Sequence, residues 1–413
     1  MASPISYNLA AFFKDIIKGS AKLQILSDSR YVDDVSGRMP TGIAKVWDVP
    51  WNSWITPGCM TNTTGTATEL GVVQNQTAGS STTQNPTITN VPTALPAQYN
   101  GTTGAALKQF NDKVFTSNPG FPATILINEF KTDYFKNANW SDGVAMNAKW
   151  IGFSGTGYAN IDLYSYRNGV QQTTQSINLA STSGMITAAQ TCGSGTGAMR
   201  MNTVTNSNPN TKYLTQYGVY FYRNVFLSRG VEFFSLSNGG LTCTDYAETG
   251  ANDRFNGNIN NLSYYMNGTH LIVDLGENTT AAEQADVNVL KAKLEIGIDR
   301  IIASSGPTIT KVLILSQYAT TTYAGNVPYM DARTDAQYAL AVSRGWSFYN
   351  QYLASGTYAS LFAAGYIPDG KHPSASGSIF FMTNLWNAGV NSVVNSNAYN
   401  RMKLVTGGSL NGL

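Results

Sequence analysis

Residues 22–30 read Lys-Leu-Gln-Ile-Leu-Ser-Asp-Ser-Arg, and this stretch decides how the rest of the chain is interpreted. Residues 22–26 form a mostly apolar run with the length of a short strand, and a polar turn follows. In an open α/β sheet, ligands bind beyond the carboxyl ends of the strands. Ser29 stands at that position, so it is either a surface residue of a strand–helix loop or a candidate nucleophile.

Segments on both sides of this stretch have the alternation of an α/β protein. Strands connected by helices of ordinary length imply a parallel sheet covered on both faces. The apolar runs predict strands at 231–236, 271–275 and 311–315. The apolar spacing predicts helices at 5–18, 217–228, 281–303, 336–353 and 376–391.

A long middle segment has a different texture. Its first part, 61–104, is rich in Thr, Asn, Gly and Gln, and short alternating runs with the pattern of strands follow from 123. Short strands at this spacing predict a β-sandwich. We therefore expect a discontinuous α/β domain at 1–60 and 213–395, an inserted, mostly β domain at 61–212, and a C-terminal tail at 396–413.

The composition excludes several classes of protein. Charged residues make up 12% of the chain, about half the usual share, and the formal net charge is +2. Without a basic run, binding of nucleic acid through its phosphates is not expected. No apolar run reaches the length of a membrane span, and Lys14 and Lys18 follow the first apolar run instead of preceding it as in a signal peptide.

A serine hydroxyl needs a neighbouring base to become a nucleophile, and histidine is the base suited to neutral pH. The chain has 2 histidines. His270 begins an apolar strand, which favours a structural role. His372 lies in a polar loop shortly after Asp369, whose carboxylate would hold the correct imidazole tautomer.

Cleavage of an ester also needs hydrogen-bond donors directed at the developing oxyanion. Gly240 and Asn278 follow the second and third predicted strands. The backbone N–H groups of Ser29 and Gly240 and the side-chain amide of Asn278 would supply three donors. The alternatives are a plain turn glycine at Gly240 and a helix N-cap at Asn278.

Four short segments, in order, resemble the four blocks of the SGNH (GDSL-type) hydrolases. They are Ser27-Asp28-Ser29, Gly240-Leu241-Thr242, Gly276-Glu277-Asn278 and Asp369-Gly370-Lys371-His372. Ser27 stands where the family usually has Gly, and Thr279 stands where an Asp often follows the Asn. The resemblance implies a flavodoxin-like three-layer α/β/α fold. It also implies a Ser29 nucleophile, oxyanion donors at Gly240 and Asn278, a general base at His372 with Asp369 as its partner, and neither a metal nor a cofactor.

Further residues are candidates for contact with the substrate. Trp47, Trp51 and Trp54 are close in sequence and would either form a stacking wall for a sugar or pack beneath a long loop. Arg30 adjoins the candidate nucleophile. The surface is rich in Asn, Thr and Gly and poor in charge, which favours a carbohydrate partner and also resembles phage tail and capsid-decoration proteins.

The sequence thus predicts a serine esterase that removes O-acyl groups, with O-acetyl favoured, from a carbohydrate such as a polysaccharide. Other virion proteins are expected partners if the source is viral, and the protein would then be virion-associated. Two alternatives stay open. One is a lipid or small-ester hydrolase, and the other is a glycan-binding virion protein with an inactive site.

Overall fold

The structure is a computed structural model. The residues that it describes are 3–31, 39–55, 73–75, 87–89, 113–116, 124–130, 146–153, 160–167, 170–178, 185–193, 197–203, 213–237, 241–249, 266–323 and 325–405.

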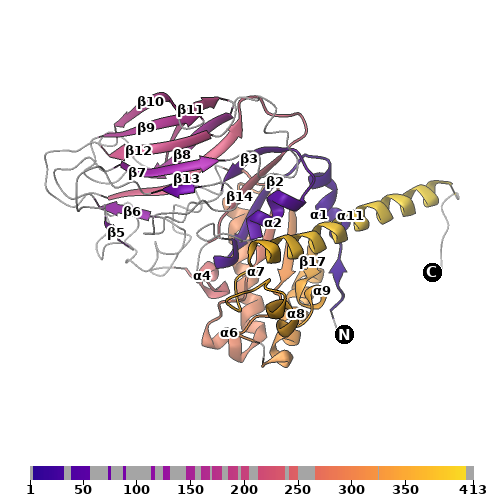
Figure 1. The fold of residues 1–413 in the computed structure, drawn as a ribbon. Coiled ribbons are helices and arrows are strands. Elements are labelled where there is room, and N and C mark those ends of the chain that lie inside the picture. The colour runs from indigo at the N-terminus through magenta and orange to yellow at the C-terminus, as the bar shows by residue number, and fades with distance from the viewer. Residues whose placement is uncertain are drawn as a thin grey trace.

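A parallel sheet forms the centre of the α/β part (Figure 1). Its strands, in chain order, are β2 (Lys22–Ser27), β14 (Val231–Ser235), β15 (His270–Asp274), β16 (Lys311–Ser316) and β17 (Ser347–Asn350). In space the order is β17-β16-β15-β2-β14, and each neighbouring pair is parallel. Because β14 lies on one side of β2 and β15 on the other, the strand order reverses at β2, where a ligand crevice is expected.

Two separate cores cover the two faces of this sheet. One core contains α1 (Leu9–Ile17), α2 (Met39–Val46) and α11 (Ala375–Val405), and the other contains α4 (Cys243–Ala247), α7 (Val287–Ser304) and α8 (Val327–Arg344). Successive residues of β15 alternate between them, since Ile272 belongs to the first core and Leu271 and Val273 to the second. The result is the predicted three-layer arrangement. The shorter helices are η1 (Ser29–Tyr31), α6 (Ala281–Ala285), α9 (Gln351–Ser355) and α10 (Tyr358–Ala363).

Strand β3 (Trp51–Ile55) connects this sheet to the β-rich part of the chain. It pairs in parallel with β14 and antiparallel with β13 (Tyr213–Arg223), while β1 (Ser6–Tyr7) pairs antiparallel with β17 at the other edge. Beyond β13 the sheet continues through β5 (Thr87–Thr89), β6 (Lys113–Thr116), β8 (Met146–Phe153) and β11 (Met185–Gly193). A second sheet packs against it (Figure 1) and contains β4 (Val73–Asn75), β7 (Thr124–Phe130), β9 (Asn160–Arg167), β10 (Val170–Asn178) and β12 (Gly197–Thr203).

Three of the predicted helices differ from the structure. The helix predicted at 217–228 is wrong, because this stretch belongs largely to strand β13. The helix predicted at 281–303 is divided at Asp286, which ends α6 and caps α7 with φ of −144°. The helix predicted at 336–353 ends at Arg344, where Gly345 adopts a φ of 67° and β17 follows.

The three neighbouring tryptophans are part of the first core, so the prediction that they contact the substrate is wrong. Trp47 and Trp51 are 0% exposed and Trp54 is 1% exposed. The ring of Trp47 stacks on Trp386, and the ring of Trp54 stacks on Phe233. Their large apolar surfaces are buried between helix and sheet, which is the packing alternative.

Within the described ranges, every helix lacks the combination of length and hydropathy that crossing a membrane requires.

Candidate active site

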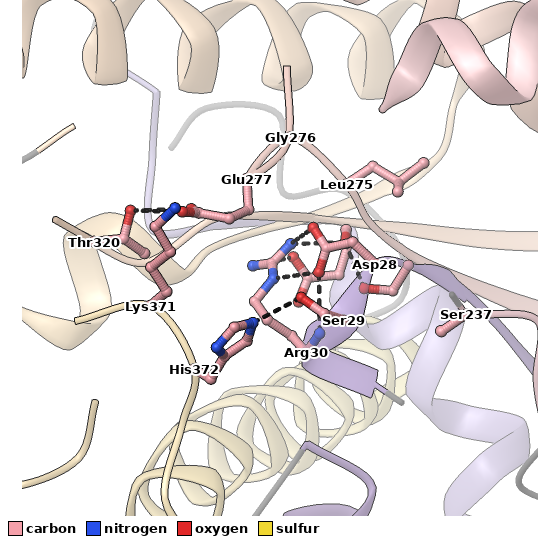
Figure 2. Close-up of polar contacts among 12 residues, drawn as sticks. Asp28, Ser29, Arg30, Ser237, Leu275, Gly276, Glu277, Thr320, Lys371 and His372 are labelled. Carbon is pink, nitrogen blue, oxygen red and sulfur yellow. Dashed lines mark hydrogen bonds and ion pairs between the residues drawn. The ribbon is translucent and has the colours of Figure 1, made fainter. Parts of the chain in front are cut away.

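Ser29 lies just beyond the carboxyl end of β2, at the first residue of η1. Its Oγ atom is 2.8 Å from Nε2 of His372 (Figure 2). On the other side of the imidazole ring, Nδ1 of His372 is 2.6 Å from Oδ2 of Asp369. The structure therefore brings the three predicted residues into one hydrogen-bonded row, although 343 positions separate the serine from the histidine.

The carboxylate of Asp369 determines how the imidazole ring is protonated. Partial burial acts to raise the pKa of Asp369. Hydrogen bonds from the backbone N–H of His372, the His372 side chain and the backbone N–H of Lys371 outweigh it and lower this pKa to about 2. The ionised carboxylate accepts the proton of Nδ1, so Nε2 is the acceptor that faces the hydroxyl of Ser29. This is the arrangement that a general base needs.

The loop that carries His372 is fixed to the loop after β16. Gly370 has a φ of +81°, and a Cβ atom there would lie 2.4 Å from Cγ2 of Thr321, so this position requires glycine. The carbonyl of Gly370 accepts the backbone N–H of Thr321 at 2.8 Å. The hydroxyl of Tyr318 donates to the carbonyl of Lys371 at 2.6 Å.

A buried ion cluster lies beside Ser29 (Figure 2). Arg30 is 0% exposed, so the prediction that it contacts the substrate is wrong. Its guanidinium donates to both carboxylate oxygens of Asp28 and pairs with the carboxylate of Asp274 at 2.9 Å. It also donates to the carbonyl of Asp274 at 2.8 Å, and therefore ties the segment of Ser29 to the end of β15.

The turn after β15 holds the predicted oxyanion donor Asn278. The carbonyl of Gly276 accepts from Nη1 of Arg333 at 2.6 Å. The hydroxyl of Tyr323 donates to the carbonyl of Glu277 and lies 2.6 Å from Oγ1 of Thr279. Among these fixed neighbours, the buried Nδ2 of Asn278 has no hydrogen-bond partner in the structure.

Of the two interpretations of Asn278, the structure excludes one, and the role as an oxyanion donor stays a prediction. The alternative role as a helix N-cap is wrong, because Thr280 caps α6 by accepting the N–H of Glu283. A buried donor without a partner is destabilising, so its presence fits a group that binds a ligand.

Gly240, the other predicted donor, lies outside the described residues, and its role stays a prediction. The described chain ends at Ser237 before it and resumes at Leu241. Ser237 lies on the side of Ser29 opposite His372 (Figure 2). Helix α4 begins shortly afterwards, with Thr242 as its N-cap.

The second histidine has a structural position. His270 begins β15, at the edge of the sheet opposite Ser29, and is 2% exposed. Its Nδ1 is 2.9 Å from the hydroxyl of Thr269, and its ring packs edge-on against Phe12. In the described part of the chain, no group of three or more His, Cys, Asp or Glu side chains is arranged to hold a metal ion.

Several residues that build the site were not predicted from the sequence. Asp274 directly follows the apolar residues of β15, at the carboxyl edge of the sheet where ligands bind. Its position in the sequence is therefore a signal that it lies near the site. Glu277 lies between Gly276 and Asn278, in the third of the four segments that resemble the SGNH blocks, but its own residue type gives no signal of a role. Thr320 and Arg333 carry no local signal, because their function depends on which loops meet in space.

No protein-family model matches the sequence, and no curated protein matches it. Among solved structures, a peptidoglycan O-acetylesterase has a similar fold, with a TM-score of 0.56 and 16% identity over 94% of this chain and 96% of that chain. A family two carbohydrate esterase from Clostridium thermocellum has a TM-score of 0.32 and 9% identity over 68% of this chain and 95% of that chain. An acetylxylan esterase from Geobacillus stearothermophilus has a TM-score of 0.28 and 14% identity over 38% and 71% of the two chains. The first of these likenesses, together with the strand order, shows that the chain has the α/β fold of the SGNH hydrolases.

Proposed function

We propose that this protein is a serine carboxylic-ester hydrolase that removes O-acyl groups, with acetyl favoured, from a carbohydrate. The observation that carries the proposal is the row of hydrogen bonds from Asp369 through His372 to Ser29, at 2.6 and 2.8 Å. The same fold in a peptidoglycan O-acetylesterase supports the substrate class. The location in a virion stays a prediction from composition.

In the first half of the reaction, Oγ of Ser29 attacks the acyl carbon while Nε2 of His372 takes the hydroxyl proton. The electron pair of the carbonyl double bond moves to its oxygen. The backbone N–H of Ser29, the amide of Asn278 and the backbone N–H of Gly240 are the proposed donors to this oxyanion. The carboxylate of Asp369 stabilises the imidazolium that forms.

The tetrahedral intermediate then collapses, and the bond between the acyl carbon and the sugar oxygen breaks. His372 gives its proton to that oxygen, so the sugar leaves as an alcohol and Ser29 keeps the acyl group. In the second half, His372 removes a proton from water, and the resulting hydroxide attacks the acyl carbon. The second intermediate releases the free acid, and Oγ of Ser29 recovers its proton from His372.

One observation favours the alternative of a lipid or small-ester hydrolase. A largely apolar cavity of about 470 Å³ is lined by Tyr323, Met330, Tyr352 and Leu353, among others. It adjoins the loop after β16, because Ala319 and Tyr323 belong to both. A cavity of this size accommodates a medium-length acyl chain, whereas an acetyl group would leave it unused.

Active-site labelling separates an enzyme from a binding protein with an inactive site. A fluorophosphonate probe should label the wild-type protein, and Ser29→Ala should abolish the label. Ser20→Ala, in an exposed position just before β2, is the matched control and should be labelled like the wild type. Absence of label on the wild type would favour the inactive glycan-binding alternative.

Substrate profiling separates the two esterases. Acetate release should be measured from O-acetylated peptidoglycan and acetylated xylan, in parallel with hydrolysis of p-nitrophenyl esters from acetate to palmitate. The proposal predicts acetate release from a polysaccharide and a fall in kcat/KM beyond butyrate. A rise in kcat/KM with chain length would instead establish the lipid or small-ester alternative.

A further inference from the structure

Glu277 is a buried acid in the turn that carries Asn278. It stands between Gly276 and Asn278, and only 4% of its surface is exposed. An ionised carboxylate loses most of its favourable hydration when it is buried without partners. The partners of Glu277 should therefore explain why an acid occupies this position.

Two threonine hydroxyls from a neighbouring loop bind this carboxylate. Oγ1 of Thr320 donates to both carboxylate oxygens, at 3.0 and 3.2 Å (Figure 2). Oγ1 of Thr322 donates to Oε1 at 2.7 Å. Both threonines belong to the loop between β16 and α8. Glu277 therefore fixes the turn at 276–278, which carries Asn278, to that loop.

The threonine between them binds the loop of the general base. The backbone N–H and the hydroxyl of Thr321 both donate to the carbonyl of Gly370, at 2.8 and 3.3 Å. Gly370 lies between Asp369 and His372 in the sequence. Three consecutive threonines therefore bind two different parts of the candidate active site.

A buried arginine accompanies the acid. Arg333 is 0% exposed and donates to the carbonyl of Gly276, which precedes Glu277. Burial lowers the pKa of its guanidinium, and Glu277 is one of the groups whose charge acts in the opposite direction. The arginine offsets the negative charge of Glu277, which would otherwise oppose the formation of an oxyanion nearby.

We infer that Glu277 is a positioning residue, which sets the turn of Asn278 against the loop of His372 through Thr320, Thr321 and Thr322. The inference rests on the proposed function and deepens it. Asn278 and His372 come from separate segments of the chain, and the reaction needs both in register with Ser29. A displacement of about 1 Å between such groups lowers a rate by roughly 10²-fold.

The test compares Glu277→Ala and Glu277→Gln with a matched control. The control is Glu232→Gln, at the opposite edge of the sheet. Glu232 is a largely buried acid, and like Glu277 its carboxylate accepts a side-chain hydroxyl, in this case that of Tyr220. We measure kcat and KM for p-nitrophenyl acetate, together with urea unfolding. We expect Glu277→Ala to lower kcat by about 10- to 100-fold with KM within about twofold, Glu277→Gln to have a smaller effect, and Glu232→Gln to leave both constants within about twofold.

A double-mutant cycle tests whether Glu277 acts through Asn278. In the Asn278→Ala background, Glu277→Ala should lower kcat by less than about threefold, because the donor that it positions is already absent. Full additivity of the two substitutions would overturn the inference, and so would an unchanged kcat in folded Glu277→Ala.

Two further controls keep the outcome decisive. If Glu277→Ala does not fold, Glu277→Gln and Thr320→Val take its place. Thr320→Val removes one hydroxyl donor at nearly constant volume. Each should lower kcat with KM within about twofold. If the wild type hydrolyses no ester at all, the proposed function itself fails and this inference fails with it. An active wild type with unaffected Glu277 variants contradicts only the positioning role.

Discussion

The two histidines of this protein lie at opposite edges of the α/β sheet and have opposite environments. His270, at the amino end of β15, has 3% of its side chain exposed and packs against Phe12. His372, beyond the carboxyl ends of the strands, has 27% of its side chain exposed and lies between a hydroxyl and a carboxylate. The same side chain is thus a core residue at one edge and a candidate base at the other. The difference comes from the partners and the exposure that each edge provides.

The largest expected effect comes from replacing each histidine in turn. His372→Ala should lower kcat by about 10⁴-fold, because His372 is the one base among the described residues that lies within hydrogen-bond distance of the Ser29 hydroxyl. Its free energy of unfolding should change by less than about 1 kcal/mol, since the side chain is partly exposed. Steady-state kinetics and urea unfolding measure both quantities.

His270→Gln is the matched variant at the other edge. It should leave kcat within about twofold of the wild type and lower the free energy of unfolding by about 1–3 kcal/mol. A large loss of kcat in His270→Gln, or unchanged kcat in His372→Ala, would contradict the proposal that His270 is structural and His372 is the general base.

The two edges also differ in their arginines. Arg30 is buried with Asp28 and Asp274, whereas Arg344, at the end of α8, pairs with Glu295 and Asp299 near the surface. Arg30→Met should lower the free energy of unfolding by about 3–5 kcal/mol, because it leaves two buried carboxylates without their cation. Arg344→Met should lower it by less than about 1 kcal/mol. Equal effects in urea unfolding would show that the cluster beside Ser29 is not the stabilising element described above.

The pH dependence of stability gives the next effect. Burial lowers the pKa of His270 from 6.5 to about 4 and outweighs the attraction of Asp15. As the pH falls through 6.5, the unfolded chain gains a proton at this position that the folded protein binds only near pH 4. The folded state therefore loses stability between these values, by at most about 3 kcal/mol.

The measurement is the difference in urea stability between the wild type and His270→Gln from pH 7 to pH 4. The difference should shrink or reverse as the pH falls. Asp274, whose pKa is raised to about 7 by burial, titrates in both proteins, so its contribution cancels. A difference that stays constant across this range would contradict the lowered pKa.

Much of the fold could be predicted because parallel strands are covered on both faces. Such strands form continuous apolar runs, and the runs predicted β2, β14, β15 and β16 within a residue or so. The apolar pattern does not predict β17, because this strand has only four residues, Ser347–Asn350, and is separated by only two residues from α8, which ends at Arg344. The helix predicted at 217–228 covers the second half of β13, although the many aromatic residues there favour a strand.

The candidate site divides in the same way. Ser29, Asp369, His372 and Asn278 could be proposed because few residue types perform their chemistry. The residues that hold them, such as Glu277 and Thr320, lie in different loops, and no local pattern shows that these loops meet. Burial was equally invisible in the sequence, so Arg30 was assigned to the substrate when it belongs to the interior.

The smallest expected effect tests this last point on the tryptophans. Trp47→Phe should lower the free energy of unfolding by about 1–2 kcal/mol, because the smaller ring loses part of its packing against Phe13 and Trp386. KM for an acetylated polysaccharide should stay within about twofold, since a side chain that is 0% exposed contacts no substrate. A fivefold rise in KM without loss of stability would instead support the prediction that Trp47 stacks on a sugar of the substrate. Trp47 would then contact the substrate, and its assignment to the buried core would be wrong.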